Sequence, residues 1–185
     1  MLTKVGRILT ALGAIVVIVC FFLPWVHSDV VANAANLAQP MAALLKAQFG
    51  EQLQQWANIN ALSLVFGAGS VPTLYKALAV ATLLLAILTL AWAAIAAGSA
   101  PRFARLVNAI AVLLTAAVLG LLLVYRADIA QLGITTGLAA QAITALKYQV
   151  AWAFWLTVAG LVLIVLGAVL SLAGLLRRPP RTFTY

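Results

Sequence analysis

Four long apolar runs alternate with shorter polar segments along this chain. The runs cover residues 5–26, 74–97, 104–125 and 150–176. Each has roughly the 20 apolar residues with which a helix crosses a hydrocarbon core about 30 Å thick. The pattern therefore predicts an all-α integral membrane protein with four transmembrane helices, forming a single domain over residues 1–185.

The charged residues between the runs predict how the helices thread. If both termini face the cytoplasm, that side holds seven basic residues and no acid, whereas the outer side holds four basic residues and all three acids. Because segments rich in Lys and Arg stay on the cytoplasmic side, we expect cytoplasmic N and C termini and outer loops at 27–73 and 126–149. The same basic residues favour anionic lipids at the inner face as partners. The predicted location is the bacterial cytoplasmic membrane.

Composition excludes two other classes of protein. The chain is 66% hydrophobic and only 8% charged, whereas a soluble domain has about 25% charged residues. Its net charge of +8 comes from basic residues scattered at helix ends, without the interleaved stacking aromatics of a nucleic-acid site. We therefore expect no nucleic-acid partner.

Both outer loops carry helical patterns. In the first loop, Pro40 suits the first turn of a helix, and the following apolar residues share one half of a helical wheel. This amphipathic helix would pack on the outer ends of its own bundle, lie in the membrane interface, or dock onto another subunit. In the second loop, good helix formers from Gly137 onward predict that the fourth helix begins outside the membrane as one long rod. The apolar positions of the amphipathic helix are Met41, Leu44, Leu45, Phe49, Leu53 and Trp56.

Aromatic residues gather near the predicted outer ends of the helices. Such a belt is typical of the membrane interface, where amphipathic rings sit at headgroup level. Trp92 is the exception, because it lies deeper in the second run, where its indole N–H needs a partner. The predicted belt consists of Trp25, Tyr75, Tyr125, Tyr148, Trp152 and Trp155.

The fourth run carries a stripe of mostly small residues in alternating steps of four and three. Small residues let two helices approach closely in lipid, so this stripe should face protein. The heptad spacing predicts a left-handed crossing near +20°. Shorter stripes occur at Gly6, Thr10 and Ala14 and at Ala116 and Gly120. The seam is either internal to the bundle or a contact with another chain. The stripe of the fourth run is Ala153, Thr157, Gly160, Ile164, Gly167, Ser171 and Gly174.

The sequence offers little reactive chemistry. No ionisable residue lies deep in a predicted span, which disfavours a proton relay or an ion pathway. One His, one Cys and three dispersed acids provide neither a zinc site nor a catalytic triad. His27, the only imidazole, is predicted at the outer end of the first span, where it would bind water and headgroups or serve as an axial ligand to a haem or pigment. We expect no enzyme activity and no bound metal, and lipids as the principal small-molecule contacts.

Residues 21–26, which read Phe-Phe-Leu-Pro-Trp-Val, close a first helix that begins with basic residues. Gly67 and Gly69 precede the second run, and Gly133 and Gly137 precede the fourth. In these features the chain resembles a group of uncharacterised bacterial four-span membrane proteins, and the resemblance implies topology only. The loop lengths also look like those of claudin-type tetraspans. The Trp-Gly-Leu-Trp run and the paired outer cysteines of claudins are missing, so that function does not carry over.

Three functions remain from the sequence. The favoured hypothesis is a non-catalytic accessory, scaffolding or assembly subunit of a larger membrane complex, with respiratory and photosynthetic complexes as candidates and other integral membrane subunits as partners. The second is a small transporter or channel for a lipid or apolar solute. The third is a pigment- or haem-contacting subunit that uses His27.

Overall fold

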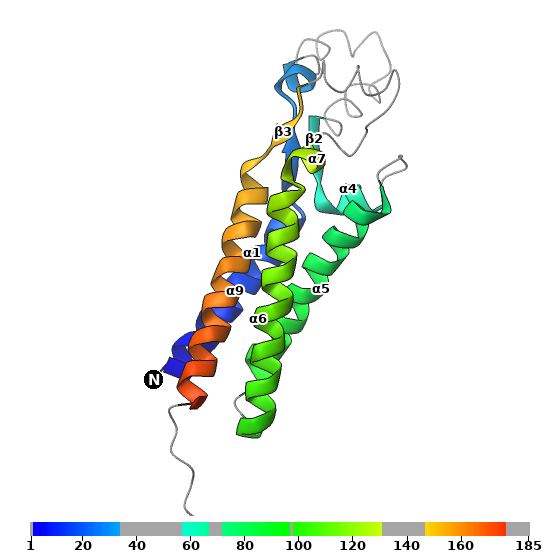
Figure 1. The fold of residues 1–185 in the computed structure, drawn as a ribbon. Helices are drawn as coiled ribbons and strands as arrows, with labels where there is room; N and C mark the ends of the chain where they lie inside the picture. Colours follow the sequence, from blue (N-terminus) through cyan, green and yellow to red (C-terminus); the bar gives the residue numbers. More distant parts are fainter. Residues whose placement is uncertain (1, 34–56, 67–71, 97, 131–146, 177–185) are drawn as a thin grey trace, which may run out of the picture.

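The computed structural model describes residues 2–33, 57–66, 72–96, 98–130 and 147–176. Four long helices stand side by side in an elongated bundle, with the start of the first and the end of the last at the same end (Figure 1). All four are long and apolar enough to cross a membrane, which confirms that part of the prediction. We call the end of the bundle where the first long helix starts and the last one ends the terminal end, and the opposite end the sheet end. The helices are α1 (Leu2–Phe21), α5 (Thr73–Ile95), α6 (Pro101–Val124) and α9 (Trp152–Leu176).

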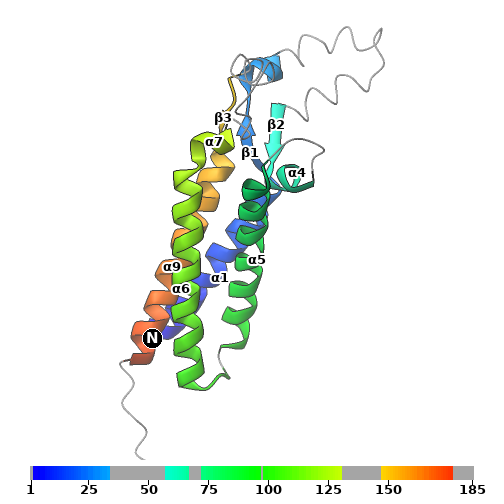
Figure 2. The same cartoon turned by 45° about the vertical axis from the view of Figure 1, so that its right-hand side comes forward.

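Each helix has defined neighbours within the bundle. The helix α1 packs between α9 and α5, while α6 packs on α9 and returns from α5 through a short turn at the terminal end (Figure 2). Proline sets two of the helix starts, since Pro72 is the N-cap of α5 and Pro101 opens α6. Its fixed φ suits the first turn, where the missing N–H costs nothing. The second and third predicted spans therefore agree with the structure to within about three residues.

A small antiparallel sheet crosses the sheet end, and it corrects the all-α prediction. Its order is β2-β1-β3, so β1 is central. Val26 and His27 of β1 face Ile59 and Asn58 on one side and Val150 and Gln149 on the other. The sheet therefore joins one segment from each of the two predicted outer loops. The strands are β1 (Pro24–His27), β2 (Asn58–Asn60) and β3 (Gln149–Val150).

The sheet also changes the ends of two predicted spans. The first was predicted to reach residue 26, but α1 ends at Phe21 because proline disfavours helix in the residue before it. The predicted long rod ahead of the fourth span is wrong, since α9 begins only at Trp152, directly after β3. Lys147, just before β3, has a φ of 48° that a helix does not accept. Two short helices, α4 (Ala61–Phe66) and α7 (Arg126–Ala130), complete the sheet end.

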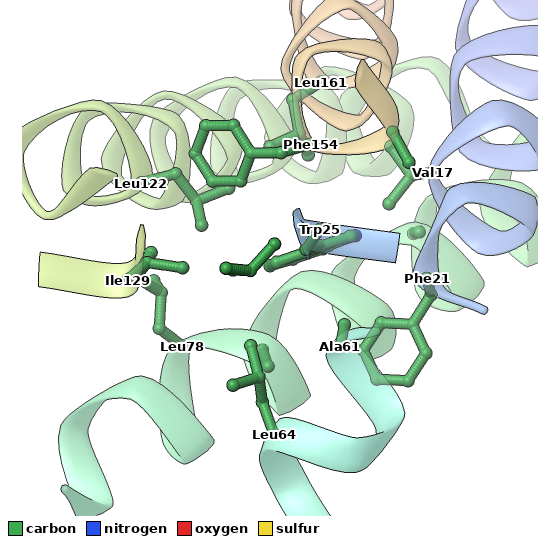
Figure 3. Close-up of a cluster of buried hydrophobic side chains, with 14 of the residues drawn as sticks. Val17, Phe21, Trp25, Ala61, Leu64, Leu78, Leu122, Ile129, Phe154 and Leu161 are labelled. Carbon is green, nitrogen blue, oxygen red and sulfur yellow. The ribbon is translucent and has the colours of Figure 1, made fainter. Parts of the chain in front are cut away.

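Trp25 lies at the centre of the core beneath the sheet, and not in an interfacial belt as predicted. Its ring packs edge-on against Phe21 and Phe154, with centroid distances of 6.3 and 5.7 Å (Figure 3). Only 1% of the residue is exposed, and its indole N–H donates to the Cys20 carbonyl at 3.0 Å. Because the chain leaves the helix before Trp25, the ring turns inward beneath the strand instead of outward to lipid. Trp152 and Trp155 are exposed at the start of α9, as a belt requires.

A second core cluster closes the terminal end. The indole N–H of Trp92 donates to the side-chain oxygen of Asn108 at 3.1 Å, which joins α5 to α6. This bond supplies the partner that a deep tryptophan requires. Nearby, the guanidinium of Arg7 donates to the Ala96 carbonyl at 2.8 Å and so ties α1 to the end of α5. Both contacts hold the helices at the end where the sheet is absent.

Candidate functional site

The predicted small-residue stripe of α9 lies inside the protein, against α1. A carbon added at the Cβ position of Gly167 would lie 2.5 Å from the Thr10 hydroxyl oxygen and 2.6 Å from the Gly6 carbonyl oxygen. A carbon added at Gly6 would likewise lie 2.5 Å from the Gly167 carbonyl oxygen. The antiparallel pairing keeps one register along the seam. Its partners are Thr3 with Gly174, Gly6 with Ser171, Thr10 with Gly167, Gly13 with Ile164, and Val17 with Gly160.

This close approach has a direct physical meaning. Ordinary van der Waals separation between carbon atoms is about 3.5–4.0 Å, so any side chain at Gly6 or Gly167 would force the two backbones apart. Ala153 and Thr157 continue the stripe toward the sheet end and are fully buried. The third-helix pair is different, because Ala116 and Gly120 lie on an exposed face of α6. The seam between α1 and α9 is thus a direct contact of backbone against backbone.

Threonines in the spans are satisfied within their own helices. The hydroxyls of Thr82, Thr115 and Thr157 each donate to the carbonyl four residues earlier, at 2.8, 2.6 and 2.9 Å. In the described part of the chain, every buried side-chain nitrogen or oxygen has a hydrogen-bond partner. The polar groups inside the bundle therefore serve packing, and their hydrogen bonds are already made.

His27 stands at the centre of a polar chain that links the sheet to its surroundings. One ring nitrogen, Nδ1, lies 2.8 Å from the Asn58 side-chain oxygen, and the other, Nε2, lies 3.0 Å from Oδ1 of Asp29. The second carboxylate oxygen of Asp29 accepts from the Gln149 side-chain amide at 3.0 Å. This chain of hydrogen bonds joins β2, β1 and β3 on the exposed side of the sheet. We call these four residues the polar chain.

Next to the polar chain lies an open hollow of about 380 Å³. Residues from all three strands and from the start of α9 line it. Trp152, the first residue of α9, is among these residues and is 59% exposed. Near β3, burial raises the pKa of the Tyr148 phenol above its ordinary value. The lining residues are Pro24, His27, Asn58, Gln149, Val150, Ala151 and Trp152.

The predictions made from the sequence for His27, for metal ligands and for the amphipathic helix have different outcomes. His27 lies in β1, and both its ring nitrogens face side-chain oxygens, so axial coordination of a haem would require breaking one of these contacts. Among the described residues, no group of three His, Cys, Asp or Glu side chains comes together as a metal site would need. The predicted amphipathic helix lies outside the described residues, with Met41, Leu44, Leu45, Phe49, Leu53 and Trp56.

Asp29, Asn58 and Gln149 were not predicted from the sequence as members of a shared site. One signal could have found part of it, since Asn58-Ile59-Asn60 alternates polar and apolar residues with the period of a strand. The partners of this segment are far away in the sequence, at β1 and β3, and periodicity does not identify them.

No protein-family model matches the chain, and neither a curated protein nor a solved structure matches it.

Proposed function

We propose that the protein is a non-catalytic accessory or scaffolding subunit of a larger complex in the bacterial cytoplasmic membrane. In this proposal the four long helices anchor the subunit, and the sheet end presents a folded surface to another membrane protein. The observation that carries the proposal is the sheet, since it ties segments from both interhelical loops into one ordered platform above the bundle.

The bundle interior supports a structural role over transport. Solute pathways use polar side chains that are free to exchange partners. Here Thr82, Thr115 and Thr157 are engaged with their own helices, and Trp92 is engaged with Asn108. The backbones of α1 and α9 are already in contact along the seam, so little room remains between these two helices for a solute.

The distribution of charge supports termini in the cytoplasm. Lys4 and Arg7 lie at the start of α1, and Arg102 and Arg105 lie at the start of α6, all at the terminal end. Basic residues there would meet anionic headgroups of the inner leaflet. Under this orientation the sheet end, with Asp29, faces outward.

Site-specific crosslinking in native membranes tests the proposal. A photoreactive amino acid replaces Asp29 at the sheet end, and a matched variant carries it at Leu113, which is 71% exposed midway along α6. We expect one defined protein adduct from position 29, and the same protein should co-purify with the unmodified chain in mild detergent.

Two results would overturn this function. The first is a chain that purifies alone and gives no protein adduct from either position. The second is saturable solute flux into liposomes that contain only this protein, which would favour the transporter hypothesis instead.

A further inference from the structure

Two side chains that line the hollow beside the polar chain are held in place by one hydrogen bond each and keep a second polar atom unpaired among the described residues. Asn58 pairs with Nδ1 of His27 through one atom of its side-chain amide, which leaves the other amide atom without a partner among the described residues. Gln149 directs its amide nitrogen to Asp29, which leaves its side-chain oxygen unpaired within the same part of the chain. The hollow therefore presents one amide atom of Asn58 on the β2 side and a hydrogen-bond acceptor, the side-chain oxygen of Gln149, on the β3 side.

Apolar surface completes the lining. Pro24, Val150 and Ala151 contribute apolar lining, and the largely exposed Trp152 adds an aromatic residue to it. A volume of about 380 Å³ falls within the range of sites that hold small molecules, which combine apolar and aromatic walls with a few placed polar groups. Because the polar chain fixes Asn58 and Gln149 before any ligand arrives, binding would cost little side-chain entropy.

The chemistry of the lining selects among ligand classes. An anion would lie close to the Asp29 carboxylate, whose side chain is 69% exposed, and would be repelled by it. A purely apolar ligand would bury the free amide groups of Asn58 and Gln149 without partners, which is unfavourable. A hydroxyl group both donates and accepts, so it can satisfy either amide. A ring that carries several hydroxyls also has an apolar face for the indole of Trp152.

We propose that this hollow is a saccharide-binding site, in which Asn58 and Gln149 bond the hydroxyls and Trp152 packs against the sugar ring. The site would accept a free sugar or the headgroup of a glycolipid. Trp152 is the first residue of α9, so a lipid headgroup at the membrane boundary would lie within reach of it. This inference is independent of the partner subunit in the proposed function.

Binding experiments on the full chain in phosphatidylethanolamine–phosphatidylglycerol nanodiscs test the proposal without sugar-based detergents. One arm adds trehalose or maltose in solution and detects contact by saturation-transfer NMR. The other arm includes glucosyl diacylglycerol in the disc and detects retained lipid by native mass spectrometry. Binding in either arm supports the site and identifies whether the sugar is free or lipid-borne.

Matched variants assign the binding to this hollow. Trp152→Ala should weaken binding at least about tenfold, since the aromatic wall is lost. Asn58→Ala, which removes the side-chain amide from the hollow, should weaken it as well. Trp155→Ala is the control, because Trp155 is 45% exposed near the start of the same helix and does not line the hollow. Unchanged melting temperatures would show that these exposed variants remain folded.

Two results would overturn the saccharide site. One is the absence of binding by any of the three probes to the wild-type protein. The other is an equal loss from Trp155→Ala and Trp152→Ala, which would mean that both residues act only as membrane anchors. Crosslinking from position 29 to a partner protein would be unaffected by either result, so failure of this inference leaves the proposed function standing.

Discussion

Replacing Gly167 with leucine tests the seam between α1 and α9 most directly. The first carbon of the new side chain would lie 2.5–2.6 Å from the Thr10 hydroxyl oxygen, the Thr10 nitrogen and the Gly6 carbonyl oxygen. Ordinary contact needs about 3.5 Å or more, so the deficit is about 1 Å. Two of the three obstructing atoms belong to the backbone and cannot rotate away. The helices must therefore separate along the seam.

Two energetic costs determine how much stability Gly167→Leu should lose. Overpacking of a well-packed core costs about 1–3 kcal/mol. A further loss comes from the dispersion contacts on either side, because a gap of about 0.5–1 Å forfeits a quarter to a half of each contact's energy. We therefore expect Gly167→Leu to lower the free energy of unfolding by at least about 2 kcal/mol, and Gly167→Ala by less.

Two matched substitutions separate packing from chemistry. Gly120→Leu makes the same change in α6, where an added Cβ would meet no heavy atom of the described chain within 4 Å. Val169→Leu changes a residue of α9 near Gly167 that is 44% exposed. Both substitutions should leave the free energy of unfolding nearly unchanged if these helix faces contact lipid, which is as apolar as leucine.

Thermal and denaturant unfolding in nanodiscs, followed by circular dichroism, would measure these differences. If Gly167→Leu unfolds like Val169→Leu and Gly120→Leu, then α1 and α9 are not in backbone contact at this seam.

Three further substitutions probe other contacts. Asn108→Ala should lower the free energy of unfolding by about 1–3 kcal/mol, because it leaves the buried Trp92 N–H unpaired. In a double-mutant cycle, adding Trp92→Phe should recover part of that loss. Strictly additive effects of the two substitutions would contradict the hydrogen bond between these side chains. Trp25→Phe should lower the free energy of unfolding by about 1–2 kcal/mol, because it removes the hydrogen bond to a backbone carbonyl and leaves a smaller ring in the core. A melting temperature equal to that of wild type would place this ring outside the core. Asn60→Ala removes the side-chain oxygen that accepts a hydrogen bond from a backbone N–H of α4 at 2.7 Å. It should lower the free energy of unfolding by about 1 kcal/mol. Amide hydrogen exchange should become faster in α4 and stay unchanged in α9.

The long helices were predictable because their signal is local. A run of spanning length and a proline at the start locate α5 and α6 without knowledge of any partner. The seam was also visible in part, since small residues in heptad spacing mark a face for close approach whichever helix covers it. The covering helix was not visible, because Gly6 and Gly13 belong to a run at the other end of the chain.

The sheet was not predictable for the opposite reason. Its strands have two to four residues each, too few for a clear period, and they pair across large sequence separations. Trp25 shows the consequence, because a tryptophan at the end of an apolar run fits an interfacial belt equally well. Only the strand that carries it, anchored by β2 and β3, turns its ring into the core. The candidate site depends on the same pairing, so His27 was found while its neighbours were not.

The seam and the sheet together have a consequence for how the chain is made. The pairing of α1 with α9 continues beyond the helices into β1 and β3, so two segments that are far apart in the sequence contact each other along most of the length of the bundle. A chain emerging from the ribosome inserts α1 long before its partner exists. Contacts between such distant segments form late, because the loop between their ends must close first. The glycine face of α1 stays uncovered until α9 has been synthesised, so the bundle cannot close before its fourth long helix is made.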